Sequence, residues 1–348
     1  MWSRADELDA LLSAAIDLEG GEDLSALGGE PLAAFAVSDA AGVSAAAASL
    51  RSGAPILVGV DEAGALPDGM ADVFDVLLTT APCAPRPWVE VGGTGADGTL
   101  AILRDTAARC PVAAAVFATV LRVGERLDFD GALTLESLAY STLLGGREFR
   151  AWRAAHPARS RKTAEPPIVR IERSGEVGVI TLARPDARNA IGAQLRDELT
   201  DALRLVHLDT SITRVELRGE GVCFSAGGDL DEFGQAADLA MAHIIRTQRS
   251  PAWLVGQIGE RLTAFIQGAA IGGGIEIAAA AAHLVADPGA VFRLPEVGMG
   301  LIPGAGGTAS LPRRIGRHRT CFMGLSGLDI DAMRARGWGL VDQVEPIG

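Results

Sequence analysis

The sequence predicts an α/β protein with two regions, a mainly helical region at residues 1–154 and a strand-and-helix region at 168–348. Short apolar strands alternate with amphipathic helices after residue 168, a pattern that fits repeated ββα units with right-handed crossovers. Before residue 154 helical apolar spacing dominates from residue 101 onward. Residues 155–167 contain basic residues and prolines but no apolar periodicity, which is typical of a linker.

Composition limits the classes of function. The chain has 348 residues, of which 48% are hydrophobic and 22% charged, enough for a sizeable core in one large or two ordinary domains. The net charge of −13 argues against nucleic acid and against an anionic membrane surface as partners. Lys162 is the one lysine among 31 basic residues, so a basic side chain that contacts phosphate would almost always be arginine.

Other sequence signals are weak or missing. The four cysteines form no C-x-x-C pair, and the five histidines have no spacing that suggests zinc, so we expect no metal site. No apolar run approaches the ~20 residues of a membrane span. The N-terminus carries acidic residues where a signal peptide needs an apolar core, and we expect a cytoplasmic protein.

The N-terminal region begins with an amphipathic pattern over Arg4–Leu18, followed by an alanine-rich stretch that favours partial helix. We expect Tyr140 and Trp152 to be core residues. The predicted elements are a partly helical segment at 31–51, strands at 56–60, 73–80 and 88–91, and helices at 111–122, 133–144 and 148–152.

The second region begins with a predicted hairpin that turns at Ser174-Gly-Glu. After it, helices and strands alternate, and glycine-rich loops lie between them. The predicted strands are 168–171, 177–182, 213–218, 262–266 and 290–294, and the predicted helices are 192–207, 237–258 and 275–286.

The glycine-rich turn Gly272–Gly274 lies between a predicted strand and a predicted helix. Its glycines let the backbone approach a ligand closely, and the helix N-terminus directs free N–H donors at that ligand. One such donor to a developing oxyanion is worth ~2.7–4 kcal/mol. Glu276 follows in the first helical turn, and Glu296 opens a second glycine-rich loop. Two carboxylates beside an oxyanion hole suit proton transfer next to a carbonyl.

These residues resemble the crotonase superfamily, the enoyl-CoA hydratases and isomerases. The resemblance covers about Pro167 to the C-terminus and implies the family's repeated ββα spiral core. It rests on the ordered motifs Leu182-Ala-Arg-Pro-Asp-Ala-Arg-Asn189-Ala, Phe224-Ser-Ala-Gly-Gly228-Asp-Leu, Gly-Gly-Gly-Ile-Glu276, Leu-Pro-Glu296-Val-Gly and Gly-Leu-Ile-Pro-Gly-Ala-Gly-Gly307-Thr.

The resemblance implies roles for four residues. Gly228 and Gly273 match the two oxyanion N–H donors, although a glycine is more often only a turn residue. Glu296 would exchange the proton at Cα, and Glu276 would hold and polarise the attacking water. The alternatives are an acid that stabilises the helix dipole at Glu276 and a surface loop acid at Glu296.

Four further residues match segments that line the CoA site in the family. Arg184, Asn189 and Ala226 belong to these segments, in which backbone groups largely hold the adenine. Asp229 belongs there too, but as an acid in front of a predicted helix it could instead cap that helix.

The sequence departs from the family pattern at its C-terminus. Crotonases usually continue beyond the motif Gly339-Leu-Val-Asp-Gln-Val with several helices that cover the site. Residues 111–152 resemble those helices, which suggests a permuted arrangement in which N-terminal helices take their place. An unrelated helical domain is the alternative. Helices far from the pocket of Gly228, Gly273 and Glu296 would exclude the permutation.

The resemblance implies an acyl-CoA substrate and hydration of a 2-enoyl-CoA, with no cofactor apart from the coenzyme A of the substrate. Double-bond isomerisation needs the same hole and one carboxylate. A cofactor-independent dioxygenase branch, which acts on dihydroxyphenylacetyl-CoA, shares the long N-terminal extension but lacks the carboxylate pair. A non-catalytic CoA-binding subunit is the fourth possibility. Family members also suggest a homo-oligomer, a trimer or a hexamer.

Overall fold

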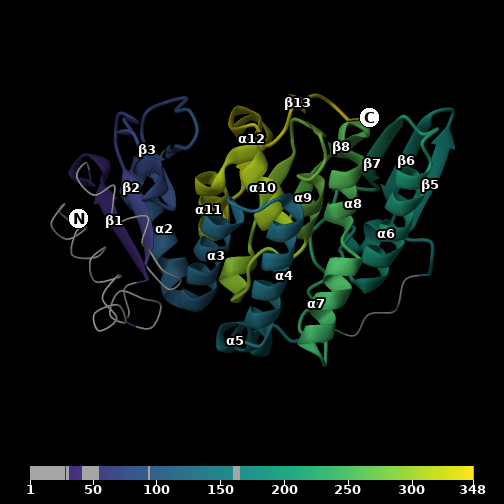
Figure 1. The fold of residues 1–348 in the computed structure, drawn as a ribbon, viewed down its shortest axis with the longest axis horizontal. Coiled ribbons are helices and arrows are strands. Elements are labelled where there is room, and N and C mark those ends of the chain that lie inside the picture. Colours follow the sequence, from purple (N-terminus) through teal and green to yellow (C-terminus); the bar gives the residue numbers. More distant parts are fainter. Residues whose placement is uncertain (1–27, 29–30, 41–54, 93–94, 160–164, 348) are drawn as a thin grey trace.

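The computed structural model describes residue 28 and residues 31–40, 55–92, 95–159 and 165–347. The four-stranded sheet of the N-terminal region and the six-stranded sheet of the second region lie at opposite ends of the molecule, and several helices of both regions lie between them (Figure 1). The helix predicted at 4–18 lies outside the described residues.

The N-terminal sheet has four parallel strands in the order β1-β2-β3-β4. The prediction of partial helix at 31–51 is wrong at its start, because residues 32–36 form a strand, followed by a 3₁₀ turn at Val37–Ala40; residues 41–51 lie outside the described residues. Pairing with the buried β2 outweighs the helix propensity of the alanines. The strands are β1 (Leu32–Ala36), β2 (Ile56–Val60), β3 (Val76–Thr79) and β4 (Val89–Glu90).

Helices α2 to α5 follow this sheet, as predicted from residue 101 onward. Pro111 starts α3, where its missing N–H costs nothing, and the Asp128 carboxylate caps α4 by accepting from Gly131 N at 2.7 Å. Within the described residues no single helix is long and apolar enough to cross a membrane; α2 and α3 reach that length only together and are bent by 109°. The helices are α2 (Gly95–Arg109), α3 (Pro111–Gly124), α4 (Phe129–Leu144) and α5 (Arg147–Ala155).

The second region is built from repeated ββα units. β8 and β10 join a six-stranded sheet of order β13-β10-β8-β7-β6-β5, whereas β9 and β11 join a three-stranded sheet of order β12-β11-β9. The loops at Gly272 and Glu296 therefore follow strands of the small sheet, whereas the loop that carries Gly228 follows β7 of the six-stranded sheet. The strands are β5 (Val169–Ser174), β6 (Val177–Leu182), β7 (Arg214–Gly219), β8 (Leu262–Ile266), β9 (Ala269–Ile271), β10 (His283–Ala286), β11 (Val291–Arg293), β12 (Ile330–Asp331) and β13 (Gln343–Val344).

Two helix predictions need correction. The helix predicted at 237–258 is two helices, because Ser250 caps α8 through Trp253 N at 3.2 Å and Pro251 begins it. The helix predicted at 275–286 ends at Ala278, since residues 283–286 pair with β8 as a strand. The helices of this region are α6 (Ala193–Leu208), α7 (Leu239–Gln248), α8 (Pro251–Ile258), α9 (Gly273–Ala278), α10 (Gly307–Ile315), α11 (Arg317–Ser326) and α12 (Ala332–Trp338).

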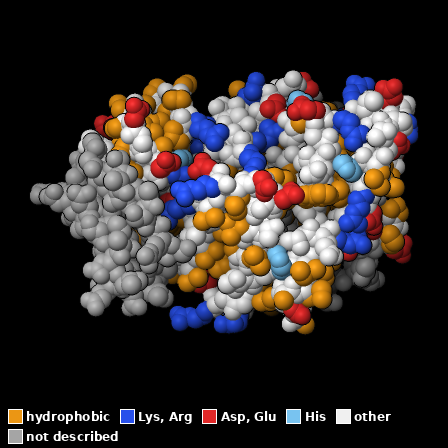
Figure 2. Space-filling model, viewed as in Figure 1, with side chains coloured by type: hydrophobic (Ala, Val, Ile, Leu, Met, Phe, Trp, Pro, Cys, Tyr) orange, Lys and Arg blue, Asp and Glu red, His pale blue; other side chains and the backbone are white. Residues whose placement is uncertain are grey.

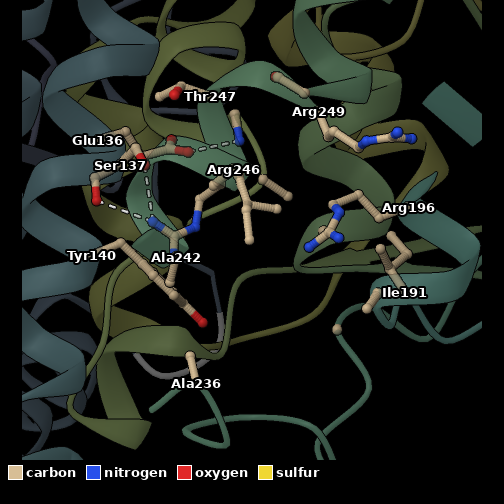
Figure 3. Close-up of a pocket in the computed structure, with 18 of the residues that line it drawn as sticks. Glu136, Ser137, Tyr140, Ile191, Arg196, Ala236, Ala242, Arg246, Thr247 and Arg249 are labelled. Atoms are coloured by element: carbon tan, nitrogen blue, oxygen red, sulfur yellow. Dashed lines mark hydrogen bonds between the residues drawn. The ribbon is translucent and has the colours of Figure 1, made fainter. Parts of the chain in front are cut away.

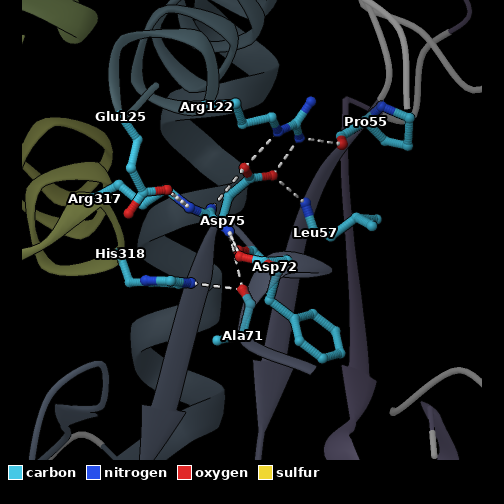
Figure 4. A network of polar contacts seen from close by, with 10 residues as sticks. Pro55, Leu57, Ala71, Asp72, Asp75, Arg122, Glu125, Arg317 and His318 are labelled. Atoms are coloured by element: carbon cyan, nitrogen blue, oxygen red, sulfur yellow. Dashed lines mark hydrogen bonds and ion pairs between the residues drawn. The ribbon is translucent and has the colours of Figure 1, made fainter. Parts of the chain in front are cut away.

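A buried ionic network ties the N-terminal sheet to α3 and α11 (Figure 4). The carboxylate of Asp75, just before β3, accepts from Arg122 Nε at 2.7 Å and from Leu57 N at 2.9 Å. Arg317 Nη1 donates to Phe74 O at 2.7 Å, and a nitrogen of His318 lies 2.8 Å from Ala71 O. Elements distant in sequence are thereby fixed as one core.

The exposed surface of α7 is apolar and reaches the rim of a cavity, which Met241 and Ile245 also line. Figure 2 shows hydrophobic side chains gathered over this helix, where Met241, Ile244 and Ile245 are exposed. Such a surface is typical of a contact site. The homo-oligomer expected from the sequence stays a prediction.

Candidate active site

A cavity of about 1080 Å³ lies between α4, α7 and the glycine-rich loops, large enough for a bulky ligand. It brings together five of the residues chosen from the sequence, of which Asp229 is discussed below, and adds Glu136 from the N-terminal region. These residues are Gly228, Asp229, Gly273, Glu276, Glu296 and Glu136.

The two glycines predicted as oxyanion donors are neighbours. Gly273 begins α9, where its N–H has no partner earlier in the helix. A methyl group on Gly273 would lie 3.8 Å from Gly228 N. The Gly228 loop is fixed by Ile191, whose N–H donates to Gly227 O at 2.8 Å and whose carbonyl accepts from Asp229 N at 3.0 Å. The backbones of both glycines therefore lie close together at the cavity wall.

Glu276 and Glu296 meet at Gly272, whose φ of 45° requires glycine. A methyl group there would overlap Glu296 Oε1 and lie 3.9 Å from Glu276 Oε1. Glu276 Oε2 accepts from Ala305 N at 2.7 Å and from Gly307 N at 3.0 Å. Within the described residues, Glu296 Oε2 is buried without a hydrogen-bond partner. One carboxylate is fixed by backbone, and the other keeps an oxygen unused.

Burial changes the acidity of these carboxylates. It raises the pKa of Glu296 to about 8, and the charge of Glu136 adds to the effect. Burial also raises the pKa of Glu276 well above its usual value, followed by the charges of Glu296 and Glu136. At neutral pH the pair therefore holds at least one proton, which is the state that a proton-transfer site needs.

Glu136 of α4 is a buried carboxylate that we did not predict as a site residue. It accepts from Gly306 N, Thr308 N and Thr308 Oγ1 at 2.7, 2.7 and 2.8 Å. Successive N–H groups of one loop thus alternate between two carboxylates, those of 305 and 307 binding Glu276 and those of 306 and 308 binding Glu136. Burial raises the pKa of Glu136 to about 7. The sequence signal was an acid on the apolar face of a helix.

Tyr140 lines the cavity rather than the core alone, which corrects the expectation from sequence. Of the helices predicted at 111–152, α4 thus borders the pocket of Gly228, Gly273 and Glu296, and the arrangement that would exclude a permutation is not found. Trp152 instead stacks on Phe149, with ring centroids 5.9 Å apart. The replacement of C-terminal helices by N-terminal ones stays a prediction.

The segments predicted to line the CoA site shape the loops near the cavity. The amide of Asn189 is fully buried and donates to the carbonyls of residues 220, 223 and 224 at 2.9–3.1 Å. This side chain has no exposed surface for a ligand, so it supports the loop that carries Gly228. Ala226 N donates to Arg188 O at 2.9 Å.

Asp229 forms a buried ion pair with Arg184, with Nη1 and Oδ2 3.1 Å apart. The prediction that Asp229 caps a helix is wrong, because Asp238 caps α7 by accepting from Ala240 N and Met241 N at 2.9 and 3.0 Å. Asp229 also borders the cavity. Contacts of Arg184, Ala226 and Asp229 with CoA stay predictions.

Comparison with known proteins matches residues 172–347 to the family described as Enoyl-CoA hydratase/isomerase. A probable enoyl-CoA hydratase of Mycobacterium bovis is 35% identical over 177 residues, 51% of this chain and 68% of that protein. The 2,3-dehydroadipyl-CoA hydratase of Escherichia coli is 37% identical over the same shares. The crystal structure of enoyl-CoA hydratase from Thermoplasma volcanium is 32% identical, with a TM-score of 0.48 over 52% of this chain and 72% of that one.

Residues 1–171, which contribute Glu136 and Tyr140 to the cavity, lie outside the family match. The matched segment holds both glycine-rich loops and both carboxylates at Gly272. On this segment, the chain belongs to the enoyl-CoA hydratase/isomerase family.

Proposed function

We propose that this protein hydrates the 2,3 double bond of a 2-enoyl-CoA thioester. The observation that carries the proposal is the meeting of Glu276 and Glu296 at Gly272, beside the adjacent backbone donors of Gly228 and Gly273. Isomerisation needs only one carboxylate, so a pair that faces one point favours the addition of water.

In this mechanism the thioester oxygen accepts hydrogen bonds from Gly228 N and Gly273 N, which stabilise the enolate as it forms. Glu276 holds the attacking water, because its Oε2 is fixed by backbone and its Oε1 faces the place of Glu296 Oε1. The water oxygen bonds to C3 and its proton passes to Glu276, while Glu296 gives its proton to C2. The raised pKa of Glu296, about 8, keeps that proton available at neutral pH.

The names of the relatives support the substrate class. The Mycobacterium bovis relative is a probable enoyl-CoA hydratase, and the Escherichia coli relative is a 2,3-dehydroadipyl-CoA hydratase. We infer that this chain also takes an acyl-CoA thioester. It acts as a hydratase of the family, with coenzyme A entering and leaving as part of the substrate.

The test follows loss of the conjugated thioester absorbance with crotonyl-CoA and with longer or aromatic 2-enoyl-CoAs. Glu276→Gln and Glu296→Gln should each lower kcat by ~10²–10⁴, as expected for lost acid–base catalysis. Glu172→Gln, an exposed carboxylate of β5, is the matched control and should leave the rate unchanged. If CoA esters bind but no enoyl-CoA is hydrated, the proposal is wrong, and isomerase and oxygen-uptake assays follow.

A further inference from the structure

One wall of the cavity, formed by α4 and α7, carries a guanidinium with unused donors. Arg246 extends from α7 toward Ser137 of α4 (Figure 3). Its Nη1 donates to Ser137 O, Ser137 Oγ and Ser141 Oγ at 3.1, 2.9 and 3.0 Å. Its guanidinium carbon lies 4.6 Å from the centre of the Tyr140 ring. One nitrogen therefore fixes the guanidinium, and Nε and Nη2 have no hydrogen-bond partner among the described residues.

The charge of Arg246 is not matched by an ion pair. Among the described residues no carboxylate oxygen lies within 4.0 Å of it, whereas Arg249 lies 3.3 Å from Asp201 and Arg196 lies 2.8 Å from Asp197. Glu136 is the nearby acid, but both of its oxygens accept from the loop of Gly306 and Thr308. Arg246 is half-buried at the cavity wall, so an anionic group of a ligand could supply the counter-charge that the protein does not.

A second donor lies beside the guanidinium. The hydroxyl of Tyr140 has no hydrogen-bond partner among the described residues, and Figure 3 shows it directed away from Arg246 and Ser137. Burial raises the pKa of Tyr140, so the phenol stays neutral and can donate. Tyr140 also packs on Gly304, next to the loop that holds Glu276, so this wall adjoins the catalytic carboxylates.

Apolar side chains line much of this part of the cavity, beside polar ones such as Thr134 and Glu232. They come from α4, α7, the Gly228 loop and the segment before α6, and they can pack against methylene groups. These apolar residues are Leu133, Leu144, Ile191, Phe233, Met241 and Ile245. A ligand that uses these apolar side chains together with Arg246 and Tyr140 would combine an apolar chain with one anionic end group.

We propose that Arg246 and Tyr140 bind a carboxylate at the far end of the acyl chain, so that the preferred substrates are 2-enoyl-CoA thioesters with an ω-carboxylate. This inference rests on the proposed function for its reaction but not for its binding chemistry. Guanidinium pairs with carboxylate through two parallel N–H donors, which Nε and Nη2 of Arg246 can supply.

The test measures binding of unreactive saturated thioesters by calorimetry, so it does not depend on turnover. Adipyl-CoA and hexanoyl-CoA have the same chain length and differ in the terminal carboxylate. Wild type should bind adipyl-CoA at least ~10-fold more tightly, a typical effect of one charge-assisted pair. Arg246→Gln should abolish that preference and leave hexanoyl-CoA binding within about 3-fold. Tyr140→Phe, which keeps the ring, should reduce the preference by less.

Arg204→Gln is the matched control. Arg204 also contacts the end of α7, through Gln248 O at 3.1 Å, but it is not among the residues that line the cavity. It should keep the preference for adipyl-CoA. Melting temperatures of all variants show whether each one is folded. If Arg246→Gln does not fold, the loss of preference for adipyl-CoA in Tyr140→Phe tests the inference.

Three outcomes would overturn the inference. Wild type could bind the two thioesters equally, or Arg246→Gln could keep the preference. Equal weakening of adipyl-CoA, hexanoyl-CoA and free CoA by Arg246→Gln would instead place Arg246 at the coenzyme. A carboxylate preference without hydration of any enoyl-CoA would contradict the proposed function and leave this binding site standing.

Discussion

The cavity has two walls that differ in how they are built. One consists of backbone: the glycine-rich loops place the N–H groups of Gly228 and Gly273 and a sharp turn at Gly272 beside two carboxylates. The other consists of side chains on α4 and α7, among them Glu136, Tyr140 and Arg246. The first wall has little freedom to change, because a Cβ at Gly272 or Gly228 would overlap a neighbouring side chain, whereas the second could change its ligand by single substitutions.

The backbone wall should be the more sensitive one. Gly272→Ala would place a methyl group on Glu296 Oε1 and strain a backbone of φ 45°. We expect kcat to fall by ~10²–10⁴, as if the acid–base group had been removed. Gly298→Ala is the control, since a methyl group there has no atom within 4 Å. Steady-state kinetics check this, and an active Gly272→Ala enzyme would show that Glu296 is not held where it reacts.

Substitutions in the side-chain wall should lower kcat less, because they displace a catalytic group rather than remove it. Glu136→Gln weakens the hold on the N–H groups of Gly306 and Thr308, and the same loop fixes Glu276. A misplaced catalytic group costs up to ~10²-fold, so we expect kcat to fall by ~10–100-fold and KM to stay nearly constant.

Thr308→Val separates positioning from mere stability. It removes one of the three donors to Glu136 and keeps the carboxylate, so its loss of kcat should be smaller than that of Glu136→Gln. Equal melting temperatures with unequal kcat would support a positioning role. A higher KM with an unchanged kcat would contradict the positioning role.

Acidity distinguishes the two carboxylates further. Hydration needs a proton on Glu296 and an ionised Glu276, and burial raises the pKa of both, that of Glu296 to about 8, so the active form is the pair that holds a single proton. We therefore expect kcat/KM for hydration to fall above about pH 8, approaching tenfold per pH unit, because kcat/KM reports groups of the free enzyme. The fall of kcat/KM above about pH 8 should be absent from the pH profile of the residual activity of Glu296→Gln.

The same shift has a consequence for stability. A carboxyl with a raised folded-state pKa binds its proton in the folded chain and loses it in the unfolded chain, so stability falls with pH between the ordinary value of 4.5 and about 8. Glu296→Gln should therefore raise the melting temperature more at pH 8.5 than at pH 5. An equal change at both values would contradict burial of the ionised form.

The two walls also differ in how far the sequence predicts them. Glycines and acids of the backbone wall act through local turns, and so Gly228, Gly273, Glu276 and Glu296 are recognisable from spacing. Glu136 and Tyr140 lie on an ordinary amphipathic helix, and their role depends on packing against a loop about 170 residues away. The helix predicted at 275–286 was too long for the same reason, because the pairing of β10 with β8 is a tertiary effect.

The smallest effect on turnover is expected in the N-terminal sheet, of which no described residue lines the cavity. Burial would raise the pKa of Asp75, but the charge and hydrogen bonds of Arg122 lower it on balance. Asp75→Asn leaves Arg122 without its counter-charge, and breaking such a buried pair costs ~3–5 kcal/mol. We expect that loss in urea unfolding and a kcat of the remaining folded enzyme within about 2-fold.

Asp72→Asn is the matched control, since the side chain of Asp72 is 90% exposed and lies 3.9 Å from Arg317. The wild-type advantage over Asp75→Asn should be complete above pH 4 and should disappear as the pH falls through the lowered pKa of Asp75, because both states then bind the proton. If Asp75→Asn lowered kcat as much as Glu136→Gln, the N-terminal sheet would itself influence the active site. The comparison of the two cavity walls would then leave out a third part of the molecule on which turnover depends.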